Sequence, residues 1–209
     1  MTPGVVSIMG PPASGKTTLA ANLCELLGAE LIREDYEGNP FLAESYAGDA
    51  CARLPAQLYF LVSRVSQLSR AGCDNGGLVV SDYAWCQDII FARLRLCPED
   101  LGCYEPLARR LGRIVREPDV LISLDADTST LLDRLVSRGR SFERVMDESF
   151  FNDMRRSCIH AARQAPCPVI SVNSAGVDFR RLDNCRDIAD EIRMHLDAAS
   201  IQTQTLPLP

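Results

Sequence analysis

The sequence predicts a single α/β domain built on a five-stranded parallel sheet flanked by helices. Three observations lead to this prediction: five short apolar runs, helical patterns between them, and a glycine-rich loop directly after the first run. Apolar runs of this length that alternate with helices are typical of strands buried on both faces of a doubly wound sheet. The five runs cover residues 4–9, 29–33, 77–82, 119–125 and 168–173.

The first run, "GVVSIM", leads into "GPPASGKTTLAANL" at residues 10–23, which fills the pattern G-x-x-x-x-G-K-[ST]. Leucines at helical spacing follow as far as Gly28. A strand, this loop and a helix in this order indicate a phosphate-binding loop (P-loop), because backbone N–H groups and the helix N-terminus face the phosphates. The fold class is therefore that of the P-loop NTPases. The loop residues expected to bind a nucleoside triphosphate are Gly10, Pro11, Pro12, Ala13, Ser14, Gly15, Lys16, Thr17 and Thr18.

Length and composition restrict the function further. With 209 residues, 46% of them hydrophobic, the chain is long enough for one domain over residues 1–198, with a flexible tail at 199–209. The net charge is −6 and no basic stretch is long enough to follow a nucleic-acid backbone, so a polymer substrate is not expected. No apolar run is long enough to span a membrane, and the first residues lack the basic segment of a secretory signal peptide.

The nine cysteines form no C-x-x-C pair, and the two histidines do not lie at metal-binding spacing to them. An odd number at irregular intervals favours reduced, mostly buried thiols in a cytoplasmic protein. A zinc site and a disulfide framework are the alternatives.

Acidic residues follow the second and third strands, where parallel sheets bind their ligands. Glu34 and Asp35 come after the second strand, and Glu34 is a candidate general base unless it is a solvated acid in a turn. Asp82 ends the third strand and is a candidate ligand of Mg²⁺ together with the Thr17 hydroxyl, the alternative being a helix N-cap. Lys16 would reach the β- and γ-phosphates.

Two further patterns carry polar side chains. Residues 54–71 predict a helix on which Gln57 and Arg64 share one face, and spacing alone favours a solvated face over a polar pocket. Downstream, Arg134, Arg138 and Arg140 surround the end of another helix and suit a lid over triphosphate oxygens, or a surface cluster. A lid excludes water, which favours transfer to an acceptor over hydrolysis.

Several stretches in this order resemble one family. They are the phosphate loop, "EDYEGNPFLAESY", "AQLYFLVSR", "SDYAWCQDIIFA" and "PDVLISLDADTSTLLDRLVSRGRSFE". Together they resemble the deoxyribonucleoside kinases, most closely the bacterial deoxyadenosine/deoxyguanosine kinase branch, over residues 4–180. The resemblance implies a homodimer that transfers the γ-phosphate of ATP, with Mg²⁺, to the 5′-hydroxyl of a deoxynucleoside in nucleotide salvage. Deoxyadenosine is slightly favoured over deoxyguanosine and deoxycytidine.

The resemblance also assigns roles to individual residues. Glu34 matches the general base, Tyr46 and Glu143 the pair that binds the sugar 3′-hydroxyl, and Gln57 the glutamine that reads the base edge. Arg64 and Asp88 match the pair that completes base recognition, which reverses the solvated-face interpretation. The remaining matches are to the lid arginines and to the loop near the ATP adenine: Arg134, Arg138, Arg140, Asp178 and Phe179.

Two departures from the family pattern leave alternatives open. Many members have an arginine directly after the acid that ends the third strand, whereas this chain has Tyr83; Asp35 stands where proline is usual. The missing arginine is the one feature that favours an ATP-binding regulatory pseudokinase. A nucleoside monophosphate kinase of the thymidylate type would need an extra arginine near Glu34, and only Arg33 is available.

Overall fold

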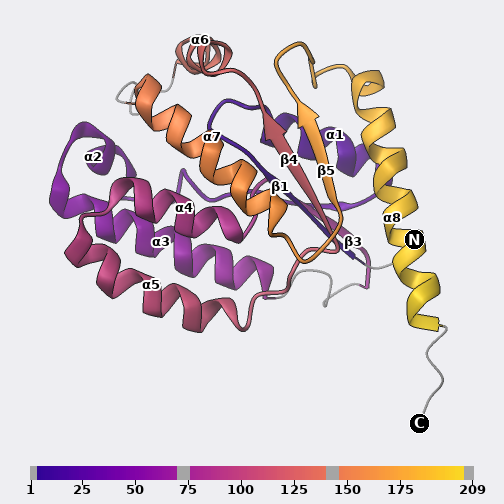
Figure 1. Cartoon of the computed structure of the whole chain (residues 1–209), viewed down its shortest axis with the longest axis horizontal. Helices are drawn as coiled ribbons and strands as arrows, with labels where there is room; N and C mark the ends of the chain where they lie inside the picture. The colour runs from indigo at the N-terminus through magenta and orange to yellow at the C-terminus, as the bar shows by residue number, and fades with distance from the viewer. Residues whose placement is uncertain (1–3, 70–75, 140–145, 205–209) are drawn as a thin grey trace.

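The computed structural model describes residues 4–69, 76–139 and 146–204 (Figure 1). Within these residues the strands pair in parallel in the order β2-β3-β1-β4-β5, which confirms the predicted α/β class. Because β1 lies between β3 and β4, the loop that follows it is at the switch point of the sheet, where ligands of this fold bind. The strands are β1 (Gly4–Met9), β2 (Glu30–Ile32), β3 (Leu78–Ser81), β4 (Val120–Asp125) and β5 (Val169–Asn173).

Helices cover both faces of the sheet (Figure 1). One face is covered by α1 (Lys16–Leu27) and α8 (Arg186–Gln204), which follows the short 3₁₀ helix η2 (Leu182–Cys185). The opposite face is covered by α3 (Ala50–Leu68), α4 (Cys86–Arg95) and α7 (Glu148–Arg163), with α5 (Pro98–Gly112) packed outside α3 and α4. The chain also forms α2 (Leu42–Ala47), and α6 (Thr128–Arg138) directly after β4.

The central strands are apolar on both sides, which is why they read as continuous hydrophobic runs. Val6 and Ile8 of β1 pack under α1 and α8, whereas Val5 and Met9 point to the opposite layer. All four side chains are fully buried. The strand ends are thereby held rigidly at one edge of the sheet.

The helix predicted over residues 54–71 begins earlier, at Ala50. Asp49 caps it, since the carboxylate of Asp49 accepts a hydrogen bond of 2.8 Å from the Cys51 N–H group. The helix ends at Leu68, and residues 70–71 lie outside the described part of the chain.

Two further expectations need correction. Of the cysteines in the described residues only Cys158 and Cys185 are buried. The exposed ones are Cys51 in α3, Cys97 directly before α5 and Cys103 in α5. Burial of cysteine is a tendency of the residue type, and nothing in the sequence around these three positions makes them face the core. Residues 199–204, expected in the flexible tail, continue α8, because no glycine or proline interrupts that helix before Pro207.

Among the described helices, none combines the length and the apolar character that crossing a membrane requires.

The packing of α1 on the sheet leads to a stability prediction. Leu23 is fully buried between α1 and the strands, so Leu23→Ala should lower the free energy of unfolding by about 2–5 kcal/mol. Chemical denaturation measures the difference. Val62→Ala, at a helix position that is 61% exposed, is the matched control and should change the stability by less than about 0.5 kcal/mol. Equal losses in both variants would contradict the assigned core.

Candidate active site

The phosphate loop links β1 to α1 and has the geometry of an anion site. Gly15 has φ 99°, and a side chain there would approach the Phe179 ring to 2.9 Å. A Cβ atom at Gly10 would lie 2.6 Å from the Leu124 carbonyl oxygen, so both positions require glycine. The Ser14 hydroxyl is completely buried and has no hydrogen-bond partner among the described residues. An unsatisfied buried donor inside the loop fits the bound phosphate that the sequence motif implies.

Two side chains hold this loop in place. Lys16 Nζ donates hydrogen bonds to the carbonyls of Gly10 and Pro11, at 2.8 and 2.9 Å. Gln87 of α4 clamps the backbone of Gly10 from the other side, since its Nε2 donates to the Gly10 carbonyl at 3.0 Å and its Oε1 accepts from the Gly10 N–H at 3.3 Å. Burial lowers the pKa of Lys16, and the charges of Glu34 and Asp82 oppose that shift.

Asp82 connects the phosphate loop to the end of β2. One carboxylate oxygen accepts from the Thr17 hydroxyl at 2.6 Å, and the other accepts from the Glu34 N–H at 2.8 Å. Helix α4 begins only at Cys86, after Trp85, so the N-cap alternative for Asp82 does not apply. Burial raises the pKa of Asp82, and the hydrogen bonds from Thr17 and Glu34 counteract this effect.

A buried arginine joins the residues proposed for catalysis and base recognition. The Arg64 side chain is 4% exposed and forms ion pairs with Glu34 and Asp88. Its Nη1 donates to Asp88 Oδ2 at 2.5 Å, and its Nε and Nη2 both donate to Oε1 of Glu34. Arg64 therefore gives Glu34 a guanidinium partner in a chain that has Tyr83, not arginine, directly after Asp82. The solvated-face interpretation from spacing alone was wrong.

Gln57 lies two turns from Arg64 on the same face of α3 and is 5% exposed. Its Nε2 donates to the backbone carbonyl of Asp88 and to the Tyr104 hydroxyl, both at 3.3 Å. The Tyr104 hydroxyl in turn donates to Asp88 Oδ1. Gln57, Arg64, Asp88 and Tyr104 thus form one buried polar network, which we call the base-side network.

A second cation lies beside the predicted sugar-binding residue Tyr46. The Arg95 guanidinium is 3.6 Å from the centre of the Tyr46 ring, and its Nη2 donates to the Ser45 carbonyl and hydroxyl at 3.1 and 3.2 Å. Sequence reasoning missed Arg95. The available signal was its position seven residues after Asp88, on the same face of α4. Glu143, the predicted partner of Tyr46, lies outside the described residues.

Asp35 does not direct its carboxylate toward Glu34. Its two oxygens accept from the Tyr59 hydroxyl at 2.5 Å and from the Gly38 N–H at 3.0 Å. The loop that follows Glu34 is thereby tied to α3, and Asp35 stabilises the turn in place of the usual proline.

The predicted lid arginines occupy different surroundings. The Arg134 guanidinium donates to the Ser174 carbonyl at 2.6 Å and to the Ala175 carbonyl at 3.2 Å, so it holds the loop after β5. Arg138, the last residue of α6, lines the cavity beside Lys16, and its charge contributes to the lowered pKa of Lys16. Arg140 lies outside the described residues.

The predicted adenine-side residues follow β5. Phe179 is buried against the phosphate loop at Gly15, and its backbone carbonyl accepts from the Asn22 amide. Asp178 is paired with Arg180 at 2.8 Å.

One cavity brings most of these groups together at the carboxyl end of the sheet. Sequence reasoning predicted a role for nine of the residues that line it, and the aromatic rings of Phe60 and Phe91 complete its wall. The nine are Pro12, Lys16, Thr17, Glu34, Tyr46, Gln57, Arg64, Asp82 and Arg138, of which the first three belong to the phosphate loop.

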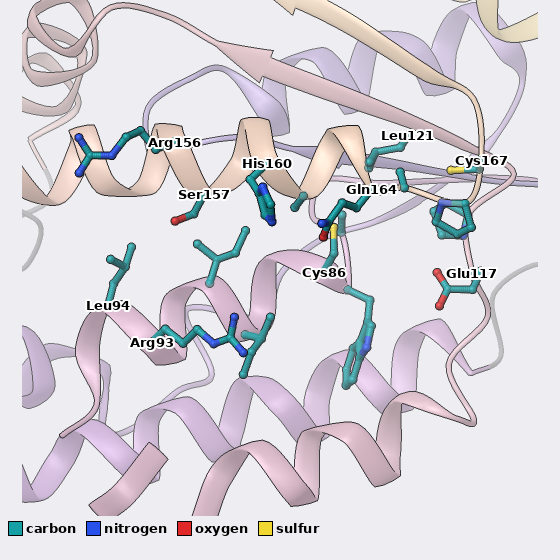
Figure 2. A pocket seen from close by; sticks show the side chains of 18 residues that line it. Cys86, Arg93, Leu94, Glu117, Leu121, Arg156, Ser157, His160, Gln164 and Cys167 are labelled. Atoms are coloured by element: carbon teal, nitrogen blue, oxygen red, sulfur yellow. The ribbon is translucent and has the colours of Figure 1, made fainter. Parts of the chain in front are cut away.

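A larger cavity of about 570 Å³ lies elsewhere, between α4 and α7 (Figure 2). Leu121, early in β4, and Cys167, just before β5, line it, so it is at the amino end of these strands. Its chargeable groups include Arg93, Glu117 and His160. Because ligands of parallel sheets bind at the carboxyl end, the smaller cavity is the candidate active site.

Fold and cavity define a P-loop protein with a polar cavity beside its phosphate loop. The family model described as deoxynucleoside kinase matches residues 6–197, and the chain belongs to that family.

Relatives support the assignment. Deoxyguanosine kinase of Bacillus subtilis (strain 168) is 32% identical over 152 residues, which cover 71% of this chain and 73% of the relative. Deoxyadenosine/deoxycytidine kinase of the same organism is 27% identical over 198 residues, 90% of this chain and 91% of the relative. A structure of deoxyadenosine kinase from M. mycoides with the products dCMP and a flexible dCDP bound has a TM-score of 0.79 and 23% identity, and covers 91% of this chain and 99% of that one.

The ion pairs of Arg64 lead to a prediction for stability and its pH dependence. Arg64→Met leaves Asp88 buried without a cation, so the free energy of unfolding should fall by about 3–5 kcal/mol at pH 8. Burial already raises the pKa of Asp88, and losing the guanidinium raises it further above the unfolded value. Asp88 then binds a proton in the folded state as the pH falls, and the deficit relative to wild type should shrink toward pH 5.

Denaturation of both proteins at pH 5 and pH 8 measures this difference. Arg64→Met combined with Asp88→Asn is the matched control, because it removes one cation and one buried charge together and should recover part of the stability. A deficit that is independent of pH would show that Asp88 is not the group that Arg64 neutralises.

Proposed function

We propose that this deoxynucleoside kinase transfers the γ-phosphate of ATP to the 5′-hydroxyl of deoxyadenosine, with deoxyguanosine or deoxycytidine as further acceptors, in nucleotide salvage. One observation carries the proposal: Asp82 is hydrogen-bonded both to Thr17 of the phosphate loop and to the Glu34 backbone. A candidate base is thereby held beside the loop that would bind the donor phosphates. Positioning and electrostatic stabilisation are the main protein contributions to phosphoryl transfer.

Glu34 would act as the general base on the acceptor hydroxyl. Both Arg64 contacts go to its Oε1, and within the described part of the chain its Oε2 has no hydrogen-bond partner. The carboxylate is therefore oriented with one oxygen available for a proton. Lys16 and Arg138 would stabilise charge on the transferred phosphoryl group, and Tyr46 would bind the sugar together with Glu143.

The oxygens of Thr17 and Asp82 fit Mg²⁺, which prefers such ligands and usually takes one or two carboxylates plus substrate phosphates. Within the described residues no three His, Cys, Asp or Glu side chains form a metal-binding group on their own. The bound cation would neutralise charge on the β- and γ-phosphates. We therefore infer a magnesium site that is completed by the nucleotide.

We also infer a homodimer that works in the cytoplasm. The dimer follows from the family resemblance, and the cytoplasmic location from irregularly spaced cysteines without a C-x-x-C pair.

The deciding experiment measures ADP formation from Mg²⁺-ATP with each of four deoxynucleosides, their ribose counterparts and dTMP. Turnover of one or more deoxynucleosides, and none of dTMP, is the expected result. Turnover of dTMP would instead indicate a nucleoside monophosphate kinase. ATP binding without turnover of any acceptor would favour the regulatory pseudokinase.

Glu34→Gln tests the assignment of the base. This change keeps the size of the side chain and removes its basicity, so turnover should fall by about two or more orders of magnitude while ATP still binds. Steady-state kinetics and nucleotide titration measure the two effects. Glu37→Gln, in the exposed part of the same loop, should leave turnover near wild type. Near-normal turnover by Glu34→Gln would remove Glu34 from this role.

A further inference from the structure

Tyr104 of α5 is a member of the base-side network that no family motif quoted above includes. Tyr104 is 1% exposed and does not line the candidate cavity. It therefore lies behind Gln57, which does line the cavity. Its hydroxyl makes two hydrogen bonds, one as donor to Asp88 Oδ1 and one as acceptor from Gln57 Nε2. A residue in this position can act on a bound base only through its neighbours.

The direction of these hydrogen bonds follows from the carboxylate. An ionised carboxylate only accepts, so the single hydroxyl proton of Tyr104 goes to Asp88 and the phenol oxygen can only accept from Gln57. Burial and the charge of Asp88 raise the pKa of Tyr104, which keeps the phenol protonated at neutral pH.

This direction determines which way the Gln57 amide points. The backbone carbonyl of Asp88 is the second inward neighbour, and it too only accepts. Both neighbours therefore require the NH₂ group of the amide. A flipped amide would place its oxygen against two other acceptor oxygens, with no proton between them. Gln57 Oε1 accepts no hydrogen bond from any residue in the described ranges, and Gln57 lines the cavity.

We propose that Tyr104 is a specificity-determining positioning residue, which locks the Gln57 amide so that the pocket offers a hydrogen-bond acceptor to the base edge. The inference rests on the function proposed above. A base with an exocyclic amino group, such as adenine or cytosine, satisfies that acceptor. A base with a carbonyl oxygen in the same place opposes it and leaves it unpaired, which costs affinity.

Deoxyadenosine and deoxyinosine provide the matched test, because they differ at the edge of one purine ring. The measured quantity is the ratio of their kcat/KM values, in wild type and in Tyr104→Phe, which keeps the ring and removes the hydroxyl. Wild type should favour deoxyadenosine, and the variant should lower the ratio by about tenfold or more, with the KM for ATP unchanged. Tyr83→Phe is the control: Tyr83 is equally buried, but its hydroxyl donates to Gln67, so this variant should keep the wild-type ratio.

Two results would overturn the inference while leaving the kinase function intact. One is an unchanged ratio in Tyr104→Phe, which includes equal losses for both nucleosides, and the other is a wild type that prefers deoxyinosine. The absence of turnover with every deoxynucleoside would instead contradict the proposed function.

A binding measurement keeps the inference testable if Tyr104→Phe does not fold. Calorimetric titration of the wild type compares deoxyadenosine, purine 2′-deoxyriboside, which has no group at position 6, and deoxyinosine. A fixed acceptor predicts affinities in that order, from tightest to weakest. Binding of deoxyinosine as tight as that of the unsubstituted purine would refute it.

Discussion

The buried guanidinium of Arg64 is the interaction on which the arrangement of the site depends. One cation neutralises two carboxylates that come from different elements, Glu34 after β2 and Asp88 in α4. Removing charges from water is costly, and the close ion pairs together with the hydrogen bond from the Tyr104 hydroxyl to Asp88 offset that cost. The rings of Phe60 and Tyr83, 5.0 and 5.6 Å from the guanidinium carbon, enclose the cation further. The same pair of contacts joins Glu34, the proposed general base, to the base-side network.

The sheet provides the rigid frame for this cluster. Its buried strands end at one edge, and hydrogen bonds connect those ends directly, as Asp82 does between Thr17 and Glu34. A polar group at such an edge is oriented by backbone geometry rather than by a flexible loop. Chemistry that relies on positioning therefore benefits from short connections between strand end and side chain.

Local patterns were sufficient to predict the strands and the phosphate loop, because hydrophobic period and glycine spacing are properties of contiguous residues. The burial of Arg64 could not be predicted from the helix alone, because its partners Asp88 and Glu34 lie 24 and 30 residues away in the sequence. Gln87, Arg95 and Tyr104 escaped sequence reasoning for the same reason. Their roles depend on how α3, α4 and α5 pack, and a single sequence does not reveal which faces meet. The expected burial of the cysteines failed because side-chain type predicts burial only on average.

The contacts of Arg134 have a mechanical consequence. Its guanidinium binds the Ser174 and Ala175 carbonyls, only a few residues before Asp178 and Phe179. Helix α6 and the segment after β5 are thereby coupled as one body, and the phosphate and adenine ends of a donor nucleotide would both act on it. Such coupling is reciprocal. If binding of one end of the nucleotide helps to order this body, the other end binds more tightly by the same free energy. A donor that lacks either end would then lose more than the contacts it fails to make.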